Sequence, residues 1–497
     1  MKISSQKKLT YRSWMYEIPI LIFTFLLSVI STLHAEGALA IDKQSGLIRD
    51  RQIPSTPSPI RLAKGIVKTP QSAQDYFREA MRRYRNQDRI GAIAYFDQAI
   101  QLQPDFIDAY NNRGIVKGVM GDKLGAIADY TRAITINPKF FPAYANRGFA
   151  RLDTGDRLGA MADMQAAGNL QPNDPQLSIG KGMILAQTGD KQAAIASYNK
   201  AIKIQPKSLD AYYNRGLAKL DLGDRSGAIA DYNTVIKIQP TYANAYYGRG
   251  RAKAAAGNYQ AAIADYDQAI ALKPNLYNAY FNRAIAKKEV GDQTGAINDY
   301  NKIISLNSKE PIAYFNRAVI FAETGDRTNA ISDYTIAIGL NPQLVEAYNN
   351  RGVVNFMAGN RQAAIADYTS AIRLNPNYTV AYLNRGIIFY STREYDKAIL
   401  DYDRAIAVEP GNAELYFNRG LAQIQLQNYP LAMADYNKTI SLQPNHALAY
   451  SNRGLLYAQQ QANSAATQDL KMAAKLFQSQ NNLAGYESVL RKLAQLK

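Results

Sequence analysis

Three polar residue types recur along this sequence where side chains could bind or react. Asparagine and arginine follow a tyrosine, as at Asn112 and Arg113, and an aspartate such as Asp129 stands sixteen residues after the arginine. A guanidinium and a carboxylate can form a two-bond ion pair, and an amide both donates and accepts hydrogen bonds. Close copies recur every 34 residues, so the chemistry belongs to a repeated site and not to one catalytic centre.

The arginine and the aspartate vary together between the copies. Ten copies hold both, as Arg113 with Asp129, and the two exceptions, with Glu79 and Lys181 at the arginine position, lack both. Because an unpaired charge is costly to bury, this pattern predicts an ion pair within the protein, in a half-buried seam. The alternative is a row of cations open to an acidic ligand.

A repeated pair of helices would position these residues. The anchoring tyrosines run from Tyr76 to Tyr450, with Ser178 at the one vacant step, which makes twelve units without an insertion or a deletion. In the second unit, Gly121 and the aspartate after it end one predicted helix, and a second is predicted from about residue 124 to residue 136, before Pro138. Apolar residues recur at steps of three and four within both segments, which is the helical period.

The pattern A-Y-x-N-R-G, G-D, A-I-x-D-Y, A-I and P at this period resembles the tetratricopeptide repeat (TPR) family over more than four fifths of the chain. The resemblance implies an all-α fold, a right-handed α-solenoid (superhelix) of stacked helix-turn-helix TPR units. It also implies a concave surface, lined largely by the first helix of each unit, that binds peptides or proteins. Arg113 departs from the family pattern, which has a leucine at that position.

The asparagine varies without a partner and is the candidate for ligand binding. On a helix whose Tyr and Gly face the core, this position turns toward the inner surface, where stacked amides can hold an extended main chain of any sequence. Some TPR proteins use an asparagine row in this way. The alternative is hydrogen bonding to the neighbouring helix or to water. The row consists of Asn112, Asn146, Asn214, Asn282, Asn316, Asn350, Asn384, Asn418 and Asn452.

Large rings stand beside these amides. Rings with two side-chain torsions lose little entropy on binding and so suit a peptide groove, although they could equally pack on the next repeat. Acids such as Asp153 and Asp221, one turn further along, would favour partners that carry Lys or Arg. The rings predicted to bind peptide are Tyr213, Tyr247, Phe281 and Phe315, and Phe417 holds the same position.

The inventory of reactive groups argues against catalysis. After Ala40 the chain has no Cys, no Trp and one His, His446, which we expect to be a surface residue without a second zinc ligand. The glycines Gly180 and Gly182 fall at repeat positions and follow no predicted strand, so they do not form a phosphate loop. We therefore predict that the protein is not an enzyme and has neither a cofactor nor a metal site.

The net charge of +17 lies mainly at the two ends. Residues 91–469 hold 38 basic and 33 acidic residues, whereas residues 41–90 hold 11 and 5 and residues 470–497 hold 5 and 1. A groove for a phosphate backbone would be lined with unpaired cations, so nucleic acid is not the expected partner. The arginines near residue 83 predict a solvated helix face, or alternatively contact with anionic lipid.

Both ends differ from the repeats. Residues 1–40 combine Lys7 and Lys8 with an apolar run from Ile18 to Leu33, which predicts a signal peptide or an N-terminal membrane anchor and an exported protein. Residues 41–72 read as a basic linker that contains proline, residues 73–480 as the twelve repeats, and residues 481–497 as a C-terminal capping helix.

These features predict a non-catalytic scaffold whose concave groove binds extended peptides or partner proteins. We expect it to be exported, and periplasmic or membrane-anchored with its repeats outside the cytoplasm, with possible membrane contact through the N-terminus. The alternative is a structural spacer or self-assembling solenoid that its basic ends hold to a membrane or an acidic polymer. The sequence leaves the partner and the oligomeric state open.

Overall fold

The computed structural model describes residues 71–496, and every regular element in that range is a helix. The elements are α3 (Ala73–Arg85), α4 (Arg89–Leu102), α5 (Ile107–Met120), α6 (Lys123–Ile136), α7 (Phe141–Asp153), α8 (Arg157–Leu170), α9 (Pro175–Gln187), α10 (Lys191–Ile204), α11 (Leu209–Asp221), α12 (Arg225–Ile238), α13 (Ala243–Ala255), α14 (Tyr259–Leu272), α15 (Tyr277–Glu289), α16 (Gln293–Leu306), α17 (Pro311–Glu323), α18 (Arg327–Leu340), α19 (Val345–Met357), α20 (Arg361–Leu374), α21 (Thr379–Ser391), α22 (Tyr395–Val408), α23 (Ala413–Gln425), α24 (Tyr429–Leu442), α25 (Ala447–Gln459), α26 (Asn463–Ser479) and α27 (Leu483–Gln495).

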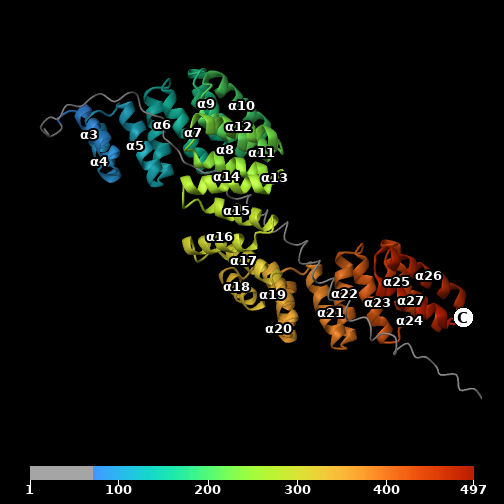
Figure 1. The fold of residues 1–497 in the computed structure, drawn as a ribbon. Coiled ribbons are helices and arrows are strands. Elements are labelled where there is room, and N and C mark those ends of the chain that lie inside the picture. The colour runs from blue at the N-terminus through green and yellow to red at the C-terminus, as the bar shows by residue number, and fades with distance from the viewer. Residues whose placement is uncertain (1–70, 497) are drawn as a thin grey trace, which may run out of the picture. The chain divides into compact units, whose positions relative to one another are not determined.

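Consecutive helices pack in pairs, one pair for each 34-residue repeat, from α3 with α4 to α25 with α26 (Figure 1). Within each unit, consecutive pairs also pack against one another, as α6 does against α7 and α22 against α23, and α27 packs against α26. The prediction of an all-α fold built from stacked helix pairs is therefore confirmed.

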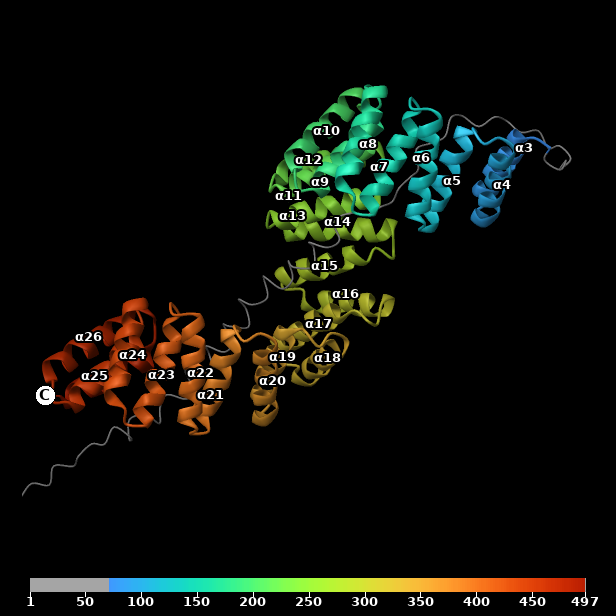
Figure 2. The ribbon, with the colours of Figure 1, turned by 180° about the vertical axis from the view of Figure 1, so that it is seen from behind.

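By its internal contacts the described chain divides into two compact units, which are described separately below. The N-terminal unit comprises residues 71–296 and the C-terminal unit residues 297–496, so the division falls within α16. Figure 2 shows the helix pairs of both units from behind.

In six repeats the turn between the two helices is made by a Gly-Asp pair. Gly121 has φ +95°, in the left-handed region that glycine adopts without strain, and this residue ends α5. The side chain of Asp122 then accepts a hydrogen bond from the N–H of Gly125 at 2.8 Å and caps α6. The repeated Gly-Asp therefore ends one helix and begins the next.

A tyrosine of the second helix fills the core of most repeats. Tyr130 is 4% exposed, and Ala126 and Ala133 beside it are fully buried. A Cβ atom built on Gly114 of the first helix would lie 2.7 Å from Cε1 of the Tyr130 ring, so the absence of a side chain lets the helix approach the ring. The small residues at fixed spacing thus set the distance between the helices.

The two sides of the stack differ within each unit. First helices of consecutive repeats contact one another, as α5 does α7 and α21 does α23, whereas second helices of consecutive repeats are further apart. We call the side on which the first helices meet the inner side, and the side on which second helices flank a first helix the outer side.

The predicted signal peptide or anchor, residues 1–40, and the predicted linker up to residue 70 lie outside the described residues. Among residues 71–496, no helix combines the length and the apolar character needed to cross a membrane.

Candidate functional site

The recurring arginine is bound to the second helix of its own repeat. In nine repeats its Nε and Nη2 donate to the two carboxylate oxygens of the aspartate sixteen residues later; for Arg147 and Asp163 the distances are 3.0 and 2.7 Å. The nine carboxylates are 3–6% exposed. The predicted ion pair is thus confirmed for Arg113 with Asp129, Arg147 with Asp163, Arg215 with Asp231, Arg249 with Asp265, Arg317 with Asp333, Arg351 with Asp367, Arg385 with Asp401, Arg419 with Asp435 and Arg453 with Asp469.

The same arginine also reaches the second helix of the preceding repeat. Nη1 of Arg113 donates to Asp97 on α4 at 2.6 Å, and Nη1 of Arg385 donates to Thr369 on α20 at 2.8 Å. The guanidinium carbon of Arg113 lies 5.4 Å from the ring centre of Tyr110, one turn earlier on the same helix. The arginine therefore faces outward between two second helices, in what we call the arginine seam, and it does not line the inner side.

In the N-terminal unit a second cation contacts the buried aspartate. It stands four residues after the arginine: Nζ of Lys219 lies 3.0 Å from Asp231, and Nζ of Lys253 lies 2.7 Å from Asp265. Lys117 and Arg151 make the same contact, at 2.9 Å each, with Asp129 and Asp163. Four repeats of this unit therefore share one carboxylate between two cations.

In the C-terminal unit this position holds no cation. It is occupied by Phe321, Asn355, Phe389, Gln423 and Tyr457. Burial raises the pKa of Asp401 above its usual range and outweighs the opposite effect of Arg385. Burial likewise raises the pKa of Asp435 despite Arg419.

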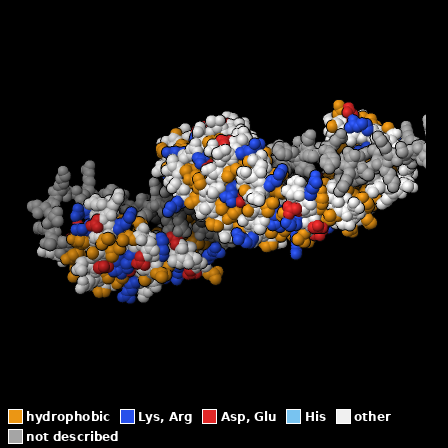
Figure 3. All heavy atoms as spheres, turned by 90° about the horizontal axis from the view of Figure 1, so that it is seen from below, with side chains coloured by type: hydrophobic (Ala, Val, Ile, Leu, Met, Phe, Trp, Pro, Cys, Tyr) orange, Lys and Arg blue, Asp and Glu red, His pale blue; other side chains and the backbone are white. Residues whose placement is uncertain are grey.

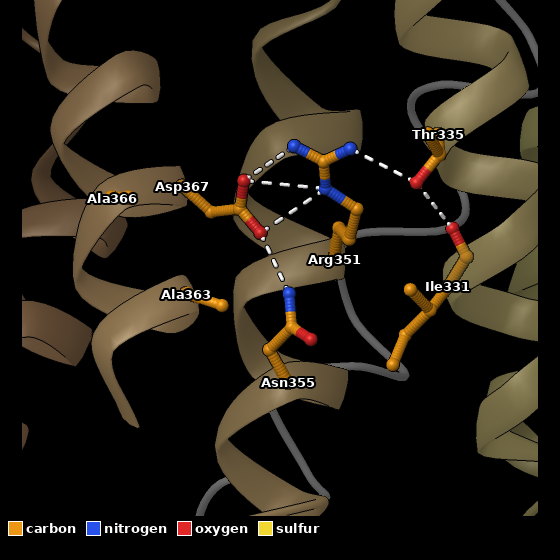
Figure 4. A pocket seen from close by; sticks show the side chains of 7 residues that line it. All are labelled: Ile331, Thr335, Arg351, Asn355, Ala363, Ala366 and Asp367. Atoms are coloured by element: carbon orange, nitrogen blue, oxygen red, sulfur yellow. Dashed lines mark hydrogen bonds and ion pairs between the residues drawn. The ribbon is translucent and has the colours of Figure 1, made fainter. Parts of the chain in front are cut away.

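Repeat nine has a hollow in the arginine seam of about 300 Å³. Ile331 and Thr335 of α18 and Ala363 and Ala366 of α20 flank it, and Asn355 of α19 lies between them (Figure 4). Asn355 stands at the position that holds a lysine in the N-terminal unit. Because asparagine is shorter than lysine, a hollow is left beside it.

Both charged groups at the hollow are engaged by the protein. The carboxylate of Asp367 accepts from Arg351 and, at 3.0 Å, from Nδ2 of Asn355 (Figure 4). Nη1 of Arg351 donates to Thr335 at 3.0 Å.

Some predicted peptide-binding asparagines bond their own helix. Nδ2 of Asn112 donates to the main-chain oxygen of Asp108, four residues earlier, at 2.8 Å. Asn214 and Asn418 make the same bond at the same distance. In these residues the amide nitrogen donates a hydrogen bond, and the amide oxygen accepts none from the described chain.

Other asparagines bond the first helix of the preceding repeat. Nδ2 of Asn146 donates to Asn111 at 3.0 Å, and Nδ2 of Asn282 donates to the hydroxyl of Tyr247 at 2.9 Å. Because these partners lie on first helices, the asparagine row faces the inner side. The alternative of bonding to a neighbouring helix thus holds for these side chains, although their amide oxygens also accept no bond from residues 71–496.

Burial divides the row further. Asn350, Asn384 and Asn452 are 9%, 5% and 5% exposed, and Asn384 bonds Asn349 of the preceding repeat. The others are half-buried, and the amide nitrogen of Asn316 is enclosed without a hydrogen-bond partner.

The predicted peptide-binding rings mostly lie in the core. Tyr213, Tyr247 and Phe281 are 5–7% exposed, and Phe315 is half-buried. Each ring of Tyr213, Tyr247 and Phe315 packs on the second-helix tyrosine of its own repeat, with ring centres 5.8–6.1 Å apart, and Phe417 does the same at 6.0 Å. These rings therefore pack within their own repeats.

Two of the acids expected on the inner face have partners within the chain. Asp153 lies 3.1 Å from Nζ of Lys123, and Asp221 lies 2.6 Å from Nζ of Lys191. On the face drawn in Figure 3, basic and acidic side chains are interspersed and form no continuous patch of one sign.

His446 is not the surface residue that the sequence suggests. It is 8% exposed, its Nδ1 accepts from the N–H of Ala449 at 3.1 Å as the cap of α25, and its ring packs on Phe417. Among residues 71–496 no group of His, Cys, Asp and Glu is placed to hold a metal ion.

Comparison with known proteins identifies the repeats. The family described as "TPR repeat" matches residues 182–223, and profiles described as "Tetratricopeptide repeat" match residues 213–276, 312–344, 345–378 and 383–446. No curated protein matches the chain.

Several solved structures are similar. The chain is 16% identical to the protein in the crystal structure of the APC/C hetero-tetramer Cut9-Hcn1, over 85% of this chain and 97% of that chain, with a TM-score of 0.41. It is 18% identical to yeast Tom70, over 85% and 96%, with a TM-score of 0.37. It is 21% identical to YrrB, a TPR protein with an unusual peptide-binding site, over 37% and 95%, with a TM-score of 0.34. From the matched profiles, the 34-residue period and the stacked helix pairs, we conclude that this chain is a tetratricopeptide repeat protein.

Proposed function

We propose that the inner side binds a partner protein in extended form, with the asparagine row accepting hydrogen bonds from the partner's main-chain N–H groups. The repeats and the family support a protein-interaction scaffold. The observation that carries the finer proposal is a set of half-buried amides on first helices whose oxygens accept no bond from the described chain. These are Asn112, Asn146, Asn214, Asn282 and Asn418.

An amide oxygen in this position suits a main chain of any sequence. Every peptide unit except proline offers an N–H donor, and the protein already holds the amide nitrogen, which fixes the direction of the oxygen. Pre-organised acceptors lose less conformational entropy on binding than free side chains do. The buried rings and the buried Asn350, Asn384 and Asn452 are left out of the proposed contact set.

The test uses Asn112→Ala combined with Asn214→Ala. A library of unstructured peptides is selected on the wild-type protein, and the affinity of the selected peptides is measured by fluorescence anisotropy. We expect at least about tenfold weaker binding by the variant, because two acceptors are lost, and little change in thermal unfolding, because each lost bond lies within one helix.

The matched control is Asn384→Ala, which removes a buried amide that bonds Asn349. It should lower stability and leave the peptide affinity unchanged. Failure to select any peptide, or equal affinity of the wild type and the double variant, would contradict the proposal.

We also propose export of the repeats, on the basis of the basic and apolar leader before residue 40. N-terminal sequencing of protein recovered from the cell envelope distinguishes a cleaved leader from a retained anchor, and a protein found only in the cytoplasm would contradict export. The alternative of a spacer held by basic ends receives less support, because Arg82 and Arg83 of α3 bond Glu79 and Asp88.

A further inference from the structure

We propose that the hollow beside Asn355 is a second binding site, on the outer side, for a lysine side chain of a partner protein. It is separate from the proposed contact on the inner side, because α18 and α20, which flank it, are second helices (Figure 4). Its occupant follows from what equivalent positions hold elsewhere in the chain.

In the N-terminal unit, the chain supplies its own cation at this place. Nζ of Lys219 lies 3.0 Å from Asp231 and 3.4 Å from the main-chain oxygen of Gly227. In repeat nine, the residues at these two positions are Asp367 and Ala363, and both line the hollow. The hollow therefore has the surroundings that receive an ammonium group in another repeat, without that group.

The polar atoms that remain available in the hollow are acceptors. The donors of Asn355 and Arg351 are directed at Asp367 and Thr335. The amide oxygen of Asn355 is turned away from Asp367, toward Ile331 (Figure 4). An ammonium group would meet this oxygen, the nearby carboxylate and the main-chain oxygen of Ala363, whereas an anion would meet the carboxylate and no open donor.

The walls suit the remainder of a lysine side chain. Ile331, Ala363 and Ala366 present apolar groups to the hollow, and a lysine packs its methylene stem on such groups while its charged end reaches a polar partner. The volume of about 300 Å³ is large enough to admit one such side chain. A lysine at the surface of a partner protein would thus complete the seam as Lys219 does within the chain.

The experiment measures binding of N-acetyl-lysine methylamide to the full chain by saturation-transfer NMR, with N-acetyl-norleucine methylamide as the uncharged probe. Asn355→Lys places a lysine on α19 where Lys219 stands on α11, and it should fill the hollow from within. We expect the lysine probe to bind the wild type at least about fivefold more tightly than it binds Asn355→Lys, and more tightly than the norleucine probe binds the wild type.

The control is Gln423→Lys, which adds the same charge at the same repeat position in another repeat. It should leave binding of the lysine probe within about twofold of the wild type, since the Asn355 hollow is unchanged. The inference is overturned if the lysine probe gives no more signal with the wild type than with Asn355→Lys, if both probes bind the wild type equally, or if Gln423→Lys abolishes binding as fully as Asn355→Lys does. Circular dichroism of each variant checks that it is folded.

Discussion

The arginine seam of each unit contains the same kind of Arg–Asp ion pair, but the two seams differ at one residue position. In the N-terminal unit, Asp231 contacts both Arg215 and Lys219, at 2.5 and 3.0 Å. In the C-terminal unit, Asp401 contacts Arg385 at 2.7 Å, and Phe389 stands where a lysine would be. The residue four positions after the arginine therefore decides whether a cation, a ring or an amide lies beside the ion pair, and repeat nine has the shortest of these, Asn355.

The inner side differs between the units as well. Asn112, Asn146, Asn214 and Asn282 of the N-terminal unit are all half-buried, whereas Asn350, Asn384 and Asn452 of the C-terminal unit are buried. A sequence row that looks uniform thus offers open acceptors chiefly in the N-terminal unit.

The largest effect we expect comes from removing the shared carboxylate. Asp231→Asn leaves Arg215 and Lys219 without their common partner, and breaking such a buried pair costs about 3–5 kcal/mol. Asp401→Asn strands only Arg385 and should cost less, about 1–3 kcal/mol. Urea unfolding and amide hydrogen exchange of the altered repeat measure both losses, and equal losses would contradict the comparison.

A smaller effect should follow from changing the second cation alone. Lys219→Asn gives repeat five the residue that repeat nine has, and the lost contact with Asp231 should cost about 1–2 kcal/mol. The chain offers a matched control in Lys237, which lies on α12 of the same repeat and makes no ion pair in the described chain. Lys237→Asn should change the free energy of unfolding by less than about 0.5 kcal/mol.

The reverse change should stabilise the C-terminal unit. Asn355→Lys exchanges a neutral hydrogen bond to Asp367 for a charged one and fills the hollow, so we expect a gain of up to about 1 kcal/mol. Urea unfolding measures the change. A loss of stability would show that the two seams are not interchangeable at this position.

The smallest effect concerns pH. Burial raises the pKa of Asp435 in the folded protein, so the folded state binds a proton before the unfolded chain does as the pH falls. The stability contributed by this group is then fully present below the ordinary value of 3.8 and is lost as the pH rises through the raised pKa. The stability of the wild type relative to Asp435→Asn should therefore increase, by less than about 1 kcal/mol, as the pH falls from 7 toward 4. Urea midpoints of the two proteins across this range test the sign.

Much of this architecture could be predicted from the sequence. The 34-residue period, the Gly-Asp turns and the joint variation of Arg113 with Asp129 each express a local rule repeated many times, and the structure has the helix pairs and the ion pairs that they predict. The arginine stands where the family has a leucine because it links the second helices of its own and the preceding repeat.

The candidate sites were harder to predict. Whether a ring such as Tyr213 is open or buried depends on Tyr232 of another helix, and whether Asn384 is free depends on Asn349 of another repeat. Asn355 gave no signal as a single residue. Only a comparison of the residues four positions after each arginine shows it as the one short amide in the series.

The third bond of the arginine has a mechanical consequence. Arg215 on α11 donates a hydrogen bond to Asn199 on α10 of the preceding repeat. A force that pulls on one repeat is therefore transmitted to the repeat before it. The repeat formed by α9 and α10 has Lys181 in place of the arginine, so it lacks the arginine hydrogen bond to the second helix of the preceding repeat, α8. Under tension along the N-terminal unit, the stack should part first at the junction between α8 and α9.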